Sequence, residues 1–474
     1  MIESHFINKF ERKIVRKISK VYNNLRTKIG FKSVQCDQLR LASIKNLKTK
    51  LILARELSKK QPHRPEWRRE VMNLAFWTNS EDLWEMFYDY HQVRQVWLEE
   101  TGLSKLKLEF VPNSMAVGSL GQFQKMEFLV RAKELGMRSE TQLTMLLPNK
   151  PELTNPALFR YIRPYLNVIE DEDLCQAMLP LEELLILPME ISLPIRVGCP
   201  HEEIAGNLIE QEWASQGRDA WLTLEDDHRE KGQKIINNLG IPKDAWYVTL
   251  HMRETGFREP DSNTNLRNVD PYSYLKAIKC ITDAGGWVFR MGNPKMKPLP
   301  ELSQVIDYAH SSIRSDMMDV FLGATSRFCL ATSSGYYVIP KAFGVPVLLT
   351  NSVQSLCYYS LTEKDIFLPC RMWKKDGLEA LDWKEYFAPP VSYNMDEDFY
   401  KTKLKFQYNT QFELAEATKE MIAILDSKSK LKPAPLQTKI MQKIEKAGHM
   451  HGGFKVKPLA SIASVFLEND ETEN

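Results

Sequence analysis

The sequence has no run of apolar residues approaching the ~20 that a transmembrane helix requires. Its seven cysteines are scattered, odd in number and never spaced as CxxC, which argues against a disulfide framework and a zinc knuckle and for a reducing compartment. The N-terminus lacks the continuous apolar segment of a secretory signal. A net charge of only +2 gives no reason to expect a nucleic-acid partner. We therefore expect a cytoplasmic protein.

Several motifs of nucleotide-binding and hydrolytic enzymes are also missing. The sequence contains no G-x-x-x-x-G-K-[ST] phosphate loop, no G-x-S-x-G elbow and no H-E-x-x-H zinc helix. Asp171 and Asp173 form a D-x-D, which could hold a metal-bound nucleotide, although helix capping and solvated turns are commoner roles for such residues. His449 and His451 lie in the tail, where we expect an unstructured pair rather than metal ligands.

The sequence does have the composition of an ordinary soluble globular protein. It has 474 residues, of which 43% are hydrophobic and 26% charged. At roughly 100–200 residues per domain, this length suits two or three domains. We predict a helical extension over 1–104, a first α/β unit over 105–235, a second over 236–394, a helix over 395–428 and a partly mobile tail over 429–474.

Residues 1–30 are predicted to form a basic amphipathic helix. Apolar residues recur at three- and four-residue spacing from Phe6 to Leu25, and lysines and arginines occupy most of the other positions. Such a helix can lie on an anionic membrane, which would place the protein at the inner face of the membrane, or it can pack on its own domain or on a partner protein. Co-sedimentation with anionic vesicles distinguishes the two.

A first α/β unit is predicted where the pattern changes after residue 105. Strands are expected over 106–111, 142–147 and 166–169, with helices over 122–135 and 156–165, and 184–187 could add a further strand. Gly118 and Gly121 lie between the first strand and its helix, where glycine lets the backbone approach a ligand. A tight turn is the alternative role for both. The order of strand, glycine-containing loop, helix and strand is typical of a nucleotide-binding α/β unit.

The second α/β unit is better defined. Short apolar strands are expected over 246–250, 287–290, 305–309, 327–330 and 344–349. Helices follow them, with Asp270 and Ser315 as capping residues. Strands of this kind suit a parallel sheet covered on both faces. A long helix over 396–425 is predicted to follow the unit.

Polar residues gather just after two strands of the second unit. His251, Arg253 and Glu254 follow the first strand, at the end where open α/β sheets bind ligands. The run Thr332 to Gly335 opens a helix after another strand and could hold phosphate through backbone N–H groups and hydroxyls. Together they predict a nucleotide-diphosphate site, and the alternative is a solvated loop. Carboxylates that could contact a ribose or base, or merely cap a helix, are Asp316 and Asp319.

These residues resemble a known family. His251-x-Arg253-x-x-Gly256, the stretch from Asp316 to Gly335, and 342–347 are similar to the carboxyl-terminal domain of GT-B glycosyltransferases. The likeness is strongest to uncharacterised bacterial glycosyltransferases associated with surface carbohydrate synthesis. It extends more distantly to fucosyltransferases with an His-x-Arg motif, but Gly256 stands where those often carry an acid, so GDP-fucose is not implied. The likeness is best over 235–350 and faint over 106–170.

The resemblance implies an α/β fold of two Rossmann-like domains that face each other across a cleft. A sugar nucleotide would be held mainly by the second domain, without a bound metal or other cofactor, because arginine and helix-dipole charge would stabilise the leaving diphosphate. By position, Arg253 would contact the diphosphate and Asp319 the nucleoside. The other implied donor-site residues are Gly118, Gly121, Gly256, Arg290 and Asn293 beside the base, Asp316, Thr332, Ser333, Ser334 and Gly335.

The implied reaction is an inverting transfer of a sugar to a glycan, a lipid-linked glycan or a protein. It needs a general base that deprotonates the acceptor hydroxyl. Glu259 and Asp261 are the first candidates, because they lie beyond the phosphate-facing turn, and Glu254 and His251 follow. Two alternatives stay open, a non-catalytic nucleotide- or glycan-binding scaffold and a sugar-nucleotide epimerase. A donor-hydrolysis screen distinguishes the three.

Overall fold

The computed structural model describes most of the chain from residue 95 onward. The described ranges are 95–137, 141–185, 202–254, 266–375, 379–388, 391–392, 402–427, 435–448 and 456–467, with six isolated positions before residue 95. The predicted basic helix over 1–30 and the His449–His451 pair lie outside these residues. So do Gly256, Glu259 and Asp261. The division into domains and the N-terminal extension stay predictions.

A seven-stranded parallel sheet forms the larger part of the mixed α/β fold, in the strand order β12-β9-β8-β7-β4-β5-β6. Its central strands are apolar and buried, as a sheet covered on both faces requires. Read outward from β4, the order is that of a doubly wound nucleotide-binding sheet. The bounds are β4 Tyr247–His251, β5 Trp287–Arg290, β6 Val305–Ile306, β7 Cys329–Thr332, β8 Val347–Ser352, β9 Ile366–Pro369 and β12 Ser461–Ile462.

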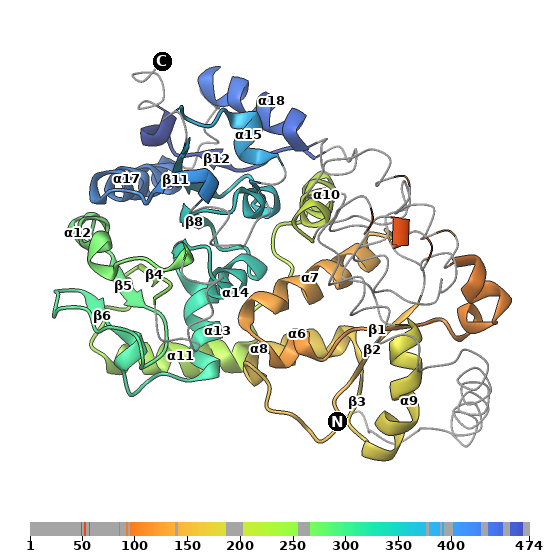
Figure 1. Cartoon of the computed structure of the whole chain (residues 1–474). Helices are drawn as coiled ribbons and strands as arrows, with labels where there is room; N and C mark the ends of the chain where they lie inside the picture. Colours follow the sequence, from red (N-terminus) through yellow and green to blue (C-terminus); the bar gives the residue numbers. More distant parts are fainter. Residues whose placement is uncertain are drawn as a thin grey trace.

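Helices cover both faces of this sheet (Figure 1). On one face α12 (Leu275–Asp283) and α17 (Gln411–Ser427) pack together, and on the other α11 (Asp226–Asn238), α13 (Asp316–Thr325) and α14 (Val338–Ala342) pack in sequence. Ser315 caps α13 by accepting a hydrogen bond from Met318 N–H, as predicted. The 3-10 helices are η5 Pro271–Tyr274, η6 Tyr308–His310, η7 Gly335–Tyr337 and η8 Ser355–Ser360, and α15 spans Trp383–Phe387.

A three-stranded parallel sheet lies beside the larger one (Figure 1). Its order is β1-β2-β3, with β1 Leu108–Phe110, β2 Gln142–Leu146 and β3 Asn167–Ile169. The helices are α6 Ser114–Val117, α7 Leu120–Glu134, α8 Pro156–Ile162 and α9 Glu172–Leu185, with the 3-10 helices η2 Leu103–Leu106 and η3 Arg163–Tyr165. A separate apolar cluster under α9 includes Leu98, so part of the segment before residue 105 packs on this sheet.

Helices α7 and α10 (Glu202–Ser215) link the two sheets. Helix α7 contacts α10, α14 and η7, and α10 contacts η8. One apolar cluster runs from Val111 in the small-sheet unit to Leu467 near the end of the chain, through both helices. The two sheets therefore share a core.

Two sequence predictions of secondary structure are wrong. Leu184 and Leu185 end helix α9 and do not form a strand. The predicted helix over 396–425 includes the strand β11 (Leu404–Gln407), paired antiparallel with β10 (Arg371–Lys374), and α17 begins only at Gln411. For the tail over 429–474 the sequence predicts no helix or strand, and the structure has α18 (Pro435–Gly448) there and the strand β12, which joins the large sheet. Both missed strands are short and depend on partners far along the chain.

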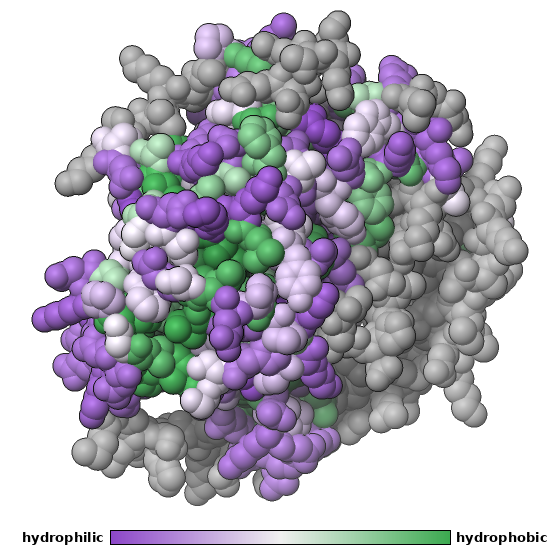
Figure 2. Space-filling model, turned by 90° about the vertical axis from the view of Figure 1, so that its left-hand side faces the viewer, coloured by the Kyte–Doolittle hydropathy of each residue, from purple (hydrophilic) through white to green (hydrophobic). Residues whose placement is uncertain are grey.

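Figure 2 shows the side of the molecule on which β6 and α12 lie in Figure 1. Among the described residues drawn there, hydrophilic side chains surround a hydrophobic patch near the centre of the view. Within the described residues, none of the helices has the length and apolar character needed to cross a membrane.

Candidate active site

Strands β4 and β7 are neighbours in the sheet, and the chain leaves them toward opposite edges. In a doubly wound sheet this is the switch point, where loops diverge and leave a crevice beyond the carboxyl ends of the strands. His251 ends β4 and Thr332 ends β7, so the two predicted polar segments meet there. A hydrogen bond connects the two segments, since the backbone N–H of Arg253 donates to the side-chain Oγ1 of Thr332 at 3.0 Å.

A cavity of about 510 Å³ opens at this crevice. Its volume lies within the ~300–1,000 Å³ typical of small-molecule sites. Both sheet units line it. The small-sheet unit contributes residues around the start of α7 and the start of α8, α10 contributes Glu203, and the remaining lining residues come from the large-sheet unit. The predicted site residues that line it are Gly121, His251, Arg253, Asn293, Asp319, Ser333, Ser334 and Gly335.

A hydroxyl-rich turn follows β7 and faces the cavity. Ser333 and Ser334 are buried, and the Ser334 hydroxyl lies 2.8 Å from His251 Nδ1. The His251 ring stacks on Tyr336 with centroids 5.5 Å apart. Burial, together with the positive charges of Arg290 and Arg253, lowers the pKa of His251 to about 3. The imidazole is therefore neutral at physiological pH and orients the serine instead of carrying charge.

Cationic side chains give the cavity a positive wall. Arg253, Arg267, Arg314 and Lys125 all line it, and they come from both sheet units. Arg253 is held at its backbone, where its carbonyl accepts a hydrogen bond from Val269 N–H at 2.9 Å. Guanidinium groups match phosphate oxygens two at a time. This wall suits an anion with several phosphate oxygens.

Asp319 lies in the same cavity on α13. Its Oδ1 accepts a hydrogen bond from the Tyr308 hydroxyl at 2.8 Å. Burial raises the pKa of Asp319 to about 7, despite the opposing effect of this hydrogen bond. The carboxyl group is therefore poised near neutral pH, and it is a hydrogen-bond donor when protonated and an acceptor when ionised.

The two sheet units touch at a pair of glycines. A Cβ added to Gly335 would lie 2.4 Å from the backbone nitrogen of Gly121, which real Cβ atoms do not tolerate. A Cβ added to Gly121 would lie 3.5 Å from Gly335 Cα, an ordinary contact. Glycine at 335 thus lets the start of α7 approach the turn that follows β7.

The structure corrects the placement of two predicted residues. Arg290 is fully buried and pairs with Glu254 and Asp307, so it does not border a base in the cavity. Glu254 uses one carboxylate oxygen on Arg290 and the other on Lys297 N–H, at 3.0 Å for the latter. It is a buried structural partner rather than an available base. Arg290 ends β5 and Glu254 follows β4, but their side chains pair with each other and neither lines the cavity.

Three further predicted residues lie outside the cavity lining. Thr332 is fully buried and accepts the hydrogen bond from Arg253 N–H, which makes it a support of the site. Asp316 is exposed, and its backbone carbonyl accepts a hydrogen bond from Asn155 Nδ2 at 3.2 Å. Gly118 closes α6, where its N–H donates to the Ser114 carbonyl. None of the three supplies a side chain to the cavity.

Comparisons with known proteins add little to this geometry. No protein-family model and no curated protein matches the sequence. Among solved structures, the chain is similar to the crystal structure of the bacterial iron-containing dodecameric glycosyltransferase TibC from enterotoxigenic E. coli H10407. The identity is 13%, the TM-score is 0.35, and the match covers 68% of this chain and 78% of that chain. A likeness this distant carries no functional argument, so function is argued from the cavity.

Several lining residues were not singled out from the sequence. They come from segments far from the strand tips and include Lys125, Asn155, Glu203, Arg267 and Arg314. Arg267 follows β4 well beyond the end of the strand, and Glu203 lies in α10, ahead of the large-sheet strands in the sequence. The sequence carries no local pattern that aims these residues at the crevice, because the approach of α7 and α10 to the large sheet places them there.

The D-x-D sequence has a structural role where the structure describes it. Asp171 Oδ1 accepts a hydrogen bond from Leu174 N–H at 2.9 Å, at the start of α9. Neither Asp171 nor Asp173 lines the large cavity. The capping alternative therefore accounts for Asp171.

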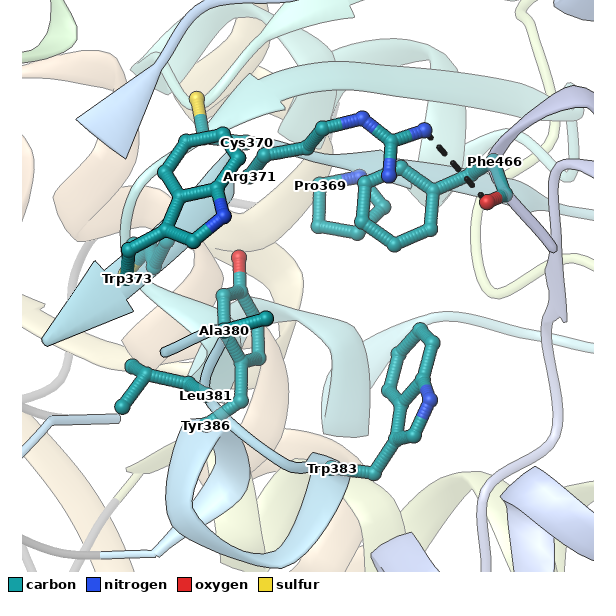
Figure 3. Close-up of a pocket in the computed structure, with 10 residues that line it drawn as sticks. Pro369, Cys370, Arg371, Trp373, Ala380, Leu381, Trp383, Tyr386 and Phe466 are labelled. Atoms are coloured by element: carbon teal, nitrogen blue, oxygen red, sulfur yellow. Dashed lines mark hydrogen bonds between the residues drawn. The ribbon is translucent and has the colours of Figure 1, made fainter. Parts of the chain in front are cut away.

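A second cavity lies near the C-terminus and is too small for a nucleotide. Its volume is about 40 Å³, room for only a few water molecules. Figure 3 shows Arg371 reaching toward Phe466, whose carbonyl accepts a hydrogen bond from its guanidinium at 3.5 Å. The guanidinium also lies 4.4 Å from the Phe466 ring centroid and pairs with Glu413 at 3.1 Å. These contacts fasten the C-terminal segment to the large-sheet unit.

Proposed function

We propose that this protein is a glycosyltransferase that moves a sugar from a nucleoside-diphosphate sugar to a carbohydrate, lipid-linked or protein acceptor. The transfer is inverting and needs no bound metal. The two sheet units act as the paired Rossmann-like domains of a GT-B enzyme, with the donor on the larger one. The supporting observation is the cavity at the switch point, which Arg253 after β4 and the turn Ser333–Gly335 after β7 both line.

The chemistry follows from the charges at this cavity. Cleavage of the sugar–phosphate bond leaves negative charge on the diphosphate, and preorganised donors aimed at that charge lower the barrier. Arg253 supplies a guanidinium, and the turn supplies two hydroxyls at the start of η7. Arg267, Arg314 and Lys125 add positive charge to the same cavity. These groups do the work that a divalent cation does in other enzymes.

The proposal is tested with Arg253→Ala. Loss of a charged hydrogen-bonding partner costs about 1.5–3 kcal/mol, so nucleoside-diphosphate affinity should fall roughly 10- to 150-fold. The readouts are calorimetric binding of UDP, GDP, ADP and dTDP, and release of nucleoside diphosphate from the matching sugar nucleotides. Arg160→Ala is the matched control, because Arg160 is half exposed and forms surface ion pairs away from the cavity.

The outcomes separate the competing functions. Slow release of nucleoside diphosphate by the wild-type protein, lost in Arg253→Ala and kept in Arg160→Ala, supports a transferase. Tight binding without turnover would instead indicate a scaffold, and interconversion of the sugar would indicate an epimerase. Wild-type turnover in Arg253→Ala would contradict the assignment of the phosphate site.

A further inference from the structure

The cavity has a second end, away from the loops that follow β5 and precede α13. This end is formed by α7, α10 and η8, and its lining residues are Gln124, Lys125, Glu203, Gln354, Leu356 and Cys357. Helix α10 packs on η8 and on α7, and Gln124 Nε2 donates to the Ser360 hydroxyl of η8 at 3.2 Å. Helices α7, α10 and η8 thus form a pocket with both polar and apolar side chains, which suits a hydroxylated acceptor.

Among the described residues that line the cavity, Asp319 and Glu203 are the carboxylates. Asp319 belongs to the α13 end and is bonded to Tyr308. Glu203 is buried in the first turn of α10. It lies close enough to Cys357 that burial and the Glu203 charge together raise the pKa of that thiol to about 12. Cys357 in turn interacts with the Ser333 side chain, and Glu203, Cys357 and Ser333 all line the cavity.

Helix α10 is held rigidly by buried polar contacts. Glu210 accepts two hydrogen bonds from Arg131 of α7, at 2.8 and 2.7 Å, and one from Lys341 of α14 at 2.8 Å. Burial opposes ionisation, but Lys341 and Arg131 outweigh it and lower the pKa of Glu210 to about 2. Asn207 donates to the carbonyls of Tyr359 and Lys457 at 2.8 Å each. Such contacts fix the orientation of a helix that carries a functional side chain.

We infer that Glu203 is the general base of the proposed transfer, and that the α7–α10–η8 end of the cavity receives the acceptor. The assignment rests on the proposed function. The acceptor O–H bond breaks and its proton passes to the Glu203 carboxylate. The acceptor oxygen bonds to the anomeric carbon, and the bond from that carbon to the diphosphate oxygen breaks. Its electron pair leaves with the diphosphate beside Arg253, and Glu203 later releases the proton to water.

The other described candidates are less suited to this role. Glu254 is committed to Arg290 and Lys297 behind the crevice. His251 is bonded to Ser334, and its pKa of about 3 makes it a weak proton acceptor. Asp319 lies at the end assigned to the nucleoside, so removal of its charge should change donor binding. Removal of the Glu203 carboxylate should change turnover instead.

The experiment uses the full chain and water as the acceptor, because hydrolysis also needs a base. Glu203→Gln keeps the size of the side chain and removes its basicity. We expect release of nucleoside diphosphate from the UDP-, GDP-, ADP- or dTDP-sugar that the wild type hydrolyses to fall by about 10²- to 10⁴-fold. Affinity for the nucleoside diphosphate, measured by calorimetry on the same preparation, should stay within about threefold.

Glu212→Gln on the same helix is the control, since Glu212 bonds to Gln216 and does not line the cavity. If the wild type hydrolyses the sugar nucleotide and Glu203→Gln does so at a rate within threefold of the wild type, the assignment of the base is overturned. The proposed function then still stands. A wild type that releases no nucleoside diphosphate overturns both. Should Glu203→Gln not fold, Glu203→Asp decides: a loss above about tenfold with unchanged binding supports the base, and unchanged turnover overturns it.

Discussion

Asp319 and His251 share one cavity, and burial drives both toward their neutral forms. Burial raises the pKa of the Asp319 carboxyl to about 7, and burial with nearby arginines lowers the pKa of His251 to about 3. Arg253, Arg267, Arg314 and Lys125 supply positive charge to the same cavity. The residues thus combine into a positive site whose strength changes with the ionisation of Asp319.

This residue-scale balance predicts a pH dependence of binding. At pH 6 Asp319 is mostly protonated, whereas at pH 8 it is ionised and repels a diphosphate. Titration of the ligand and of other groups also changes affinity with pH, but equally in both proteins. Relative to Asp319→Asn, the wild type should therefore lose affinity for UDP or GDP between pH 6 and pH 8, by up to about tenfold for one partly screened charge. Calorimetry at both pH values measures the difference, and parallel profiles would contradict the role of Asp319.

The sign of the stability effect follows from the same pKa. The folded-state pKa of Asp319 is raised above the ordinary value of 3.8, so the folded protein holds more protons between the two values. Its contribution is fully present below about pH 4 and is lost as the pH rises through about 7. Between pH 5 and 8, the Tm of the wild type should therefore decrease more steeply than the Tm of Asp319→Asn.

At the scale of elements, the strand–helix alternation of the large sheet could be predicted because each part is locally encoded. Strands such as β4 and β7 are short and apolar, and α13 has its cap at Ser315. The strands β11 and β12 could not be predicted in the same way. Each is stabilised by a partner strand that the local sequence does not reveal.

Some residues of the candidate site could likewise be predicted from the local sequence, and others could not. Arg253 and Ser333 follow strands, and the topology of parallel sheets brings such residues together, so their meeting in one cavity could be predicted. Glu203 and Lys125 reach the cavity on helices whose packing partners lie elsewhere in the chain. Arg290 and Glu254 pair with each other and do not line the cavity. Residue spacing in the sequence does not predict such a pairing.

The contact between α7 and η7 makes an element-scale prediction with a built-in control. Gly335→Ala puts a Cβ against the backbone nitrogen of Gly121, so one element must move; overpacking of this kind costs about 1–3 kcal/mol. We expect a lower Tm and weaker nucleoside-diphosphate binding, because Gly335 follows the phosphate-facing serines. Gly121→Ala meets only an ordinary contact and should change both far less. Equal effects in the two variants would contradict this packing.

At the scale of the whole molecule, distant parts of the chain converge on α10. Asn207 bonds to Lys457, 250 residues later in the chain, and the Tyr358 hydroxyl donates to the Ala460 carbonyl at 2.6 Å. Strand β12 then adds to the edge of the large sheet beside β9. The C-terminal segment therefore connects the large sheet to the helix that carries Glu203.

Asn207→Ala tests this connection. It removes the bonds to the buried Tyr359 carbonyl and to the Lys457 carbonyl, which should cost about 1–3 kcal/mol. The donor end of the cavity is built on β4, β7 and α13, so nucleoside-diphosphate affinity should stay within about threefold, while hydrolysis falls about tenfold or more because Glu203 shifts with α10. Asn237→Ala, which removes an exposed bond to Gln233 on α11, should leave Tm, binding and hydrolysis unchanged. If binding and hydrolysis fell together in Asn207→Ala, the two ends of the cavity would not be separate units, and α10 would be part of the donor site itself.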